Sequence, residues 1–206
     1  EHFYDLVGNH DASAVDEPTQ WWFRKWIDPT GESAEHSGVH ATRRPFAVDG
    51  TWERYTFRAG NLLFLMMGDR NDGGPPVGRG AVGGYPAGAV TLETYHWWRE
   101  RIEAARDSIV ISAHHHMLKE TTVGSADWEG VNEGYHGRMD DGAPIGASYL
   151  HFVGGEPDSA RFEGYLAANP GTLDLWLGAH THTHPDDVTG GRSHVETKWG
   201  THFVNV

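Results

Sequence analysis

The sequence predicts a layered α/β fold built as a single domain over residues 1–206. Short apolar runs alternate along the chain with segments of helical periodicity, an alternation typical of helices packed on a sheet. The run AGNLLFLMM (59–67) is almost continuously apolar, which indicates a strand covered on both faces. The segment TLETYHWWRERIEAARD (91–107) begins with a capping-type Thr and has apolar positions at helical spacing.

The elements follow in order along the chain. FYDLVG (3–8) is a short apolar run for which we expect a buried strand. Further strands are predicted over residues 52–58, 59–67, 108–113, 172–179 and 198–206. Helices are predicted over residues 18–26, 91–107 and 157–168. Residues 71–88, 117–150 and 185–193 are rich in Gly, Pro or acidic residues and are predicted to be loops and turns.

Composition excludes several classes of protein and site. The net charge of -13 argues against a nucleic-acid partner, because neutralising phosphates requires clustered Lys and Arg. There is no cysteine, which excludes disulfides, thiolate metal sites and a Cys nucleophile. No apolar run reaches the length of about 18 residues that a membrane helix needs. The 15 histidines are unusual, and His is the commonest metal ligand in proteins.

Metal-binding side chains follow three predicted strands, at the point where each strand ends. Asn9, His10 and Asp11 follow the first strand, three histidines (114–116) follow SIVIS, and His180 and His182 follow DLWLGA. Ligands of α/β sheets bind beyond the carboxyl ends of strands, so these clusters are expected to converge. Nitrogen and oxygen donors without thiolate suit divalent Zn, Fe, Mn or Ni. Each cluster alone is weak evidence, because exposed loop histidines are the commoner explanation, but three in succession favour a metal site.

These residues resemble a known family in their order along the chain. GNHD (8–11), ISAHHHML (111–118) and LGAHTHTH (177–184) are similar to the later motifs of the calcineurin-like metallophosphoesterases. The family's last motif is Gly-His-x-His, whereas Ala179 stands before His180 here. The resemblance extends to the segments between the motifs and thus covers nearly the whole chain. It implies a β-sandwich flanked by helices (α/β/β/α), of which this chain would lack the N-terminal part.

The resemblance also implies roles for the GNHD motif. Asn9 would bind the second of two metal ions through its side-chain oxygen. His10 would lie near the scissile phosphate and stabilise charge or protonate the leaving oxygen, and Asp11 would orient the His10 imidazole.

The later motifs would supply imidazole ligands by the same resemblance. His115 matches the family register best as a ligand of the second ion, and His114 is the alternative. His180 would bind the second ion and His182 the first. In that family a metal-activated water attacks the phosphorus of a phosphate mono- or diester, and two ions lower the pKa of the water.

Three arginines are candidate phosphate contacts, namely Arg70, Arg79 and Arg138. A structural role in a surface loop is the competing interpretation for each of them.

Two motifs of the family are missing from the expected place. An Asp-x-His and a Gly-Asp-x-x-Asp should precede GNHD, but only eight residues precede Asn9. Asp69 and Asp72 fit the second pattern, yet they lie where the family has a later strand, so we interpret them as loop or substrate-side residues. We therefore expect a C-terminal portion of a phosphoesterase with weak metal binding and little activity. The alternative is a non-catalytic metal-binding or scaffold module with the same fold.

Overall fold

A computed structural model describes residues 3–8, 11, 21–27, 30, 43–70, 88–126, 149–152 and 159–206. Its helices are α1 (Trp21–Trp26), α3 (Leu92–Ala104) and α4 (Ala160–Ala168). Its strands are β1 (Asp49–Thr51), β2 (Arg54–Ala59), β3 (Leu62–Met67), β4 (Ala89–Val90), β5 (Ile109–His114), β6 (His151–Phe152), β7 (Leu175–Gly178), β8 (Val195–Lys198) and β9 (Thr201–Asn205). Within these ranges no helix combines the length and apolar character needed to cross a membrane.

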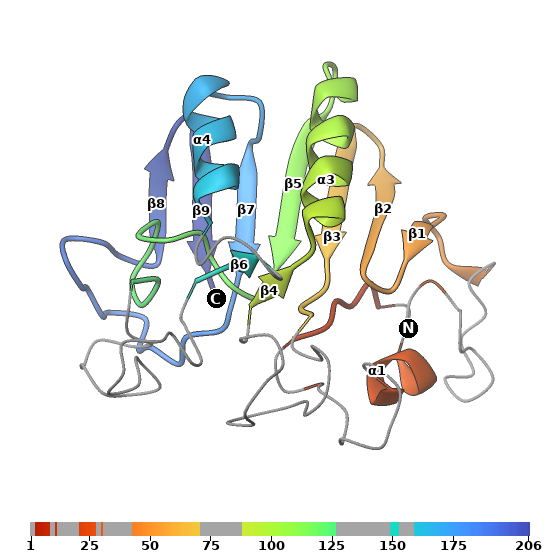
Figure 1. The fold of residues 1–206 in the computed structure, drawn as a ribbon, viewed down its shortest axis with the longest axis horizontal. Helices are drawn as coiled ribbons and strands as arrows, with labels where there is room; N and C mark the ends of the chain where they lie inside the picture. The colour runs from red at the N-terminus through yellow and green to blue at the C-terminus, as the bar shows by residue number, and fades with distance from the viewer. Residues whose placement is uncertain are drawn as a thin grey trace.

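The strands of the described ranges form a seven-stranded sheet and a separate pair, β4 with β6. The order in the large sheet is β1-β2-β3-β5-β7-β9-β8, as Figure 1 shows. The four inner strands β3, β5, β7 and β9 are mutually parallel, whereas β1, β2 and β8 pair antiparallel at the two sides. The predicted α/β class is confirmed at this level.

Both α3 and α4 cover the same face of the sheet (Figure 1). The main core lies between them and the sheet, because alternate residues of β3, β5 and β7 point to that side. Trp98 of α3 is fully buried there, and its Nε1 donates to Ser112 Oγ of β5 at 2.7 Å. On the opposite face a smaller cluster around Tyr55 and Phe57 packs with Tyr4 and Leu6 of the N-terminal segment.

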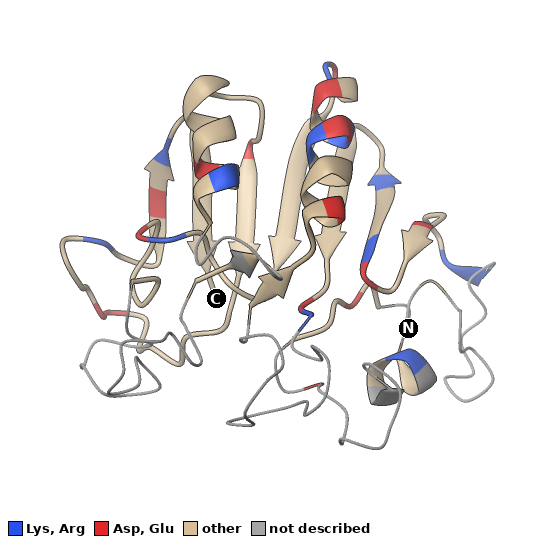
Figure 2. Cartoon of the chain, in the orientation of Figure 1, with Lys and Arg blue, Asp and Glu red and all other residues tan. Residues whose placement is uncertain are grey.

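Local sequence explains the best-predicted elements. β3 and β5 contain no Lys, Arg, Asp or Glu, and the charged residues lie on α3 and the outer strands instead (Figure 2). The side chain of Thr91 accepts from the backbone N–H of Thr94 and so caps the first turn of α3. The helices predicted over 91–107 and 157–168 therefore appear with shorter bounds.

The strand predicted over residues 3–8 is wrong, because these residues belong to neither sheet. Side chains and single backbone groups hold this segment instead of a ladder. Tyr55 Oη donates to the carbonyl of Asp5 at 2.7 Å, and the backbone N–H of Asp69 donates to the carbonyl of Val7 at 3.0 Å. The short strands β1, β4, β6 and β8 were not predicted, since each is brief and lacks a clear apolar pattern.

Candidate metal centre

Three neighbouring parallel strands carry the candidate site beyond their carboxyl ends. β3 pairs with β5, and β5 pairs with β7, so the three strands end at the same edge of the sheet. Asp69 follows β3, His115 and His116 follow β5, and His180 follows β7. The backbone N–H groups of Ala179 and His180 both donate to the carbonyl of His115, at 2.9 and 3.0 Å. These bonds fix the loop after β7 against the loop after β5.

Three imidazoles meet at this edge. His115, His116 and His180 each offer a ring nitrogen, and these nitrogens all lie within 4.8 Å of one another. The rings of His116 and His180 stack with centroids 3.8 Å apart. His116 is fully buried and His180 is 5% exposed, whereas His115 is half-buried and leaves the group accessible to solvent on its side.

The spacing of these nitrogens fits a metal ion. His180 Nδ1 and His115 Nε2 are 3.3 Å apart. Two nitrogens bound to one tetrahedral Zn²⁺ at the usual 2.0–2.1 Å are separated by about 3.3 Å, from the geometry of a tetrahedron. The pair can therefore hold an ion with little movement, and His116 adds a third donor. An N₃ set of this kind also suits other divalent first-row ions.

The strand end explains why two consecutive histidines join the group. In an extended strand, neighbouring side chains point to opposite faces. β5 ends at His114, so His115 and His116 lie in a bend where this alternation no longer applies.

His114, the alternative ligand, lies outside the three-histidine group. It points to the same side as Ser112, two residues before it, and is 1% exposed. The backbone N–H of His116 donates to His114 Nδ1 at 2.9 Å. Burial lowers the pKa of the His114 imidazole to about 4. The geometry thus favours His115 over His114.

His182 is exposed and also lies outside the group. The expectation that His180 and His182 point to one side assumed an extended segment, but β7 ends at Gly178. Between the two histidines, Thr181 is buried and its Oγ1 accepts from Asn205 Nδ2 at 2.6 Å. The role of His182 as a ligand stays a prediction.

A buried carboxylate that we had interpreted as a loop or substrate-side group lies beside the histidines. Asp69 is fully buried, and its Oδ2 is 3.8 Å from His116 Nδ1. The same oxygen accepts from the backbone N–H of Gly88 at 2.9 Å. Position in the sequence argued against Asp69, whereas the signal in its favour was the match of residues 68–72 to Gly-Asp-x-x-Asp.

The GNHD motif is only partly described. Gly8 lies against the imidazole of His115: a Cβ at Gly8 would be 3.2 Å from His115 Cγ. Asp11 Oδ2 accepts from the backbone N–H of Gly8 at 2.8 Å. The start of the motif thus reaches the histidine group, as expected. Asn9 and His10 lie outside the described residues, so their roles and the orienting role of Asp11 stay predictions.

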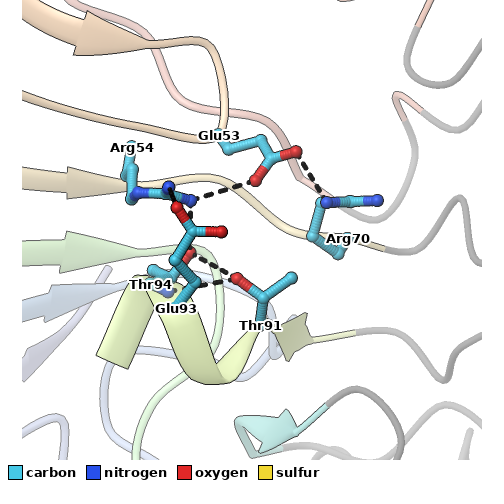
Figure 3. A network of polar contacts seen from close by, with 6 residues as sticks. All are labelled: Glu53, Arg54, Arg70, Thr91, Glu93 and Thr94. Atoms are coloured by element: carbon cyan, nitrogen blue, oxygen red, sulfur yellow. Dashed lines mark hydrogen bonds and ion pairs between the residues drawn. The ribbon is translucent and has the colours of Figure 1, made fainter. Parts of the chain in front are cut away.

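Arg70 takes part in an ion-pair network (Figure 3). Its guanidinium bonds Glu53 Oε1 at 2.6 Å and lies over the ring of Trp52, 5.5 Å from the centroid. Glu53 also pairs with Arg54, which in turn pairs with Glu93 of α3. This network gives Arg70 a structural role, and a phosphate contact stays a prediction. Arg79 and Arg138 lie outside the described residues.

Comparisons of the chain with known protein families, with curated proteins and with solved structures found no match.

Proposed function

We propose that this protein is a divalent-metal-dependent phosphoesterase that hydrolyses phosphate mono- or diesters. The observation that carries the proposal is the convergence of His115, His116 and His180 beyond the ends of adjacent parallel strands. Metal-type side chains at this position are what the motif resemblance requires. The β-sandwich that the resemblance implies belongs to the proposal and not to the observed fold. The described ranges contain one large sheet, which α3 and α4 cover on one face.

The buried and the more exposed histidines of the site would have different roles. His116 and His180 are buried and stacked, which suits ligands that hold an ion in place. His115 is half-buried, so a substrate would approach from its side. A bound divalent ion would activate water and offset the charge of the phosphate oxygens. Gly8 lies against His115 and would bring the GNHD motif to the substrate side.

A second candidate is a non-catalytic metal-binding module. The observation that favours it is that His182 is exposed and the described residues form a single three-histidine group, not two. The 206 residues also contain no Asp-x-His, so the ligands that the resemblance assigns to the first ion are incomplete. This candidate binds metal without turnover.

The experiment measures hydrolysis of bis(p-nitrophenyl) phosphate together with Mn²⁺ binding by isothermal titration calorimetry. The wild type is compared with His115→Ala, His180→Ala and the control His96→Ala, whose side chain is exposed on α3. Turnover that requires Mn²⁺, even at the low rate expected from the incomplete motifs, and that is lost in the two site variants but kept in His96→Ala supports the phosphoesterase. Binding without turnover supports the second candidate, and absence of Mn²⁺ and Zn²⁺ binding refutes both.

A further inference from the structure

Asp69 is a fully buried carboxylate in a segment held by backbone hydrogen bonds. Its backbone N–H donates to the carbonyl of Val7 at 3.0 Å. The neighbouring N–H groups donate as well, Gly68 to the carbonyl of Glu53 and Arg70 to the carbonyl of Ala89, both at 2.7 Å. Three consecutive backbone groups therefore hold the main chain from which the carboxylate projects.

The surroundings of Asp69 matter because burying a carboxylate costs free energy. An ionised carboxyl group inside a protein loses hydration and is retained only where hydrogen bonds or positive charge compensate. The N–H of Gly88 supplies one hydrogen bond to Asp69 Oδ2. The His116 imidazole lies near the same oxygen, with Nδ1 at 3.8 Å.

Asp69 lies near one particular ring nitrogen of His116. Asp69 is near Nδ1 of the ring, so a His116 tautomer that donates to Asp69 from Nδ1 presents Nε2 as the metal-binding nitrogen. Histidines that bind metals usually donate their other N–H to a carboxylate or carbonyl, which fixes the tautomer and raises the basicity of the ligand. A carboxylate accepts and never donates when ionised, so it selects the tautomer with the proton on Nδ1.

We propose that Asp69 is a positioning residue of the metal centre, which holds the His116 imidazole in the tautomer and orientation that direct Nε2 to the ion. This inference rests on the metal-binding part of the proposed function. On metal binding, the distance from His116 Nδ1 to Asp69 Oδ2 closes from 3.8 Å to a charge-assisted hydrogen bond of about 2.8 Å. Asp69 acts on the ion through His116 and is not itself a ligand.

Asp69→Asn is the informative substitution. The amide keeps the size of the side chain but removes its negative charge. Because Oδ2 of Asp69 meets both Gly88 N–H and His116 Nδ1, either the amide oxygen or the NH₂ group must take its place. An oxygen there accepts from the ring without the charge that strengthens the bond, and an NH₂ group there donates to Nδ1 and places the ring proton on Nε2, which opposes a bond between Nε2 and the ion. Both orientations weaken the selection of the tautomer that binds the ion.

The experiment titrates Co²⁺ and follows its visible absorption. Asp69→Asn is expected to weaken Co²⁺ binding by about 10–100-fold, the usual effect of removing a partner of a metal-binding His. The control Asp174→Asn should bind Co²⁺ like the wild type. Asp174 also accepts from a backbone N–H, that of Val110 at 2.8 Å, but lies before β7 at the other end of the strand.

A double-mutant cycle with His116→Ala shows whether Asp69 acts through His116. If it does, Asp69→Asn has no further effect on Co²⁺ affinity in the His116→Ala background. An equal loss of affinity in both backgrounds would mean that Asp69 binds the ion or acts through its charge alone, and would overturn the inference. Wild-type affinity in Asp69→Asn would overturn it too.

Two further readouts separate positioning from folding. Urea unfolding without metal measures the free energy of unfolding. The change that Asp69→Asn causes in it should be no larger than the change that Asp174→Asn causes. Imidazole ¹⁵N spectra of the Zn²⁺ form should show His116 protonated on Nδ1 in the wild type, and a proton on Nε2 there would refute the assignment. If the wild type itself binds no Co²⁺ or Zn²⁺, the proposed metal centre fails together with this inference.

Discussion

Gly88 is the residue whose replacement tests the packing of the candidate metal centre most directly. Its φ is +85°, in the region that side chains with a Cβ rarely adopt, and a Cβ there would lie 2.8 Å from Cγ and Cδ2 of His116. Gly88→Ala therefore combines backbone strain with a steric push on a fully buried imidazole.

Gly60 provides a matched control for the strain alone. Its φ is +64°, and nothing lies within 4 Å of a Cβ built on it. Gly60→Ala should lower the free energy of unfolding by about 1–2 kcal/mol, the cost of a left-handed conformation. Gly88→Ala should lose that amount and about 1–3 kcal/mol more, because an added methyl group overpacks a closed site.

The assay is urea unfolding of both variants without metal, followed by titration with Co²⁺. Metal affinity should fall in Gly88→Ala, since His116 must move, and should stay at the wild-type value in Gly60→Ala. Equal losses of stability in the two variants, with equal Co²⁺ affinity, would show that Gly88 does not pack against the His116 ring as the structure has it.

Three more predictions concern stability and substrate binding. Ser112→Ala should cost about 1–3 kcal/mol because it leaves the buried Nε1–H of Trp98 without its acceptor; a change within error would contradict that bond. The neutral, buried His114 should make the metal-free protein lose about 2 kcal/mol of unfolding free energy between about pH 7 and pH 5, because only the unfolded chain binds the proton there. His114→Asn should flatten this dependence, and parallel pH curves would refute the reasoning. Arg70→Gln should lower stability like Glu53→Gln and leave KM for the chromogenic diester unchanged, whereas a raised KM would identify a phosphate contact.

The sequence predicted secondary structure best where a long segment had a clear apolar pattern. The apolar run at β3 and the capped, amphipathic α3 were both predicted within a few residues, because burial and capping act locally. The N-terminal run 3–8 failed for the opposite reason: its apolar residues pack under the sheet through side chains, and no pattern distinguishes that from pairing in a ladder.

The site was partly predictable for similar reasons. That His115 and His180 converge follows from the parallel arrangement of β5 and β7. His116 and Asp69 were not chosen as site residues, because their positions depend on a bend after the strand and on backbone hydrogen bonds that Asp69 and Arg70 donate to the carbonyls of Val7 and Ala89. Such contacts join parts of the chain that are far apart, and local sequence does not specify them.

The arrangement of the site across β3, β5 and β7 also has a consequence for refolding. His115 and His180 are 65 residues apart, so their meeting requires the non-local pairing of β5 with β7, which closes a long loop at an entropic cost. An intermediate that has formed only β2, β3, α3 and β5 contains Asp69 and His116 but lacks the imidazole of His180. Recovery of the Co²⁺ spectrum should therefore lag behind recovery of helical signal, which makes the metal a reporter of the final assembly step.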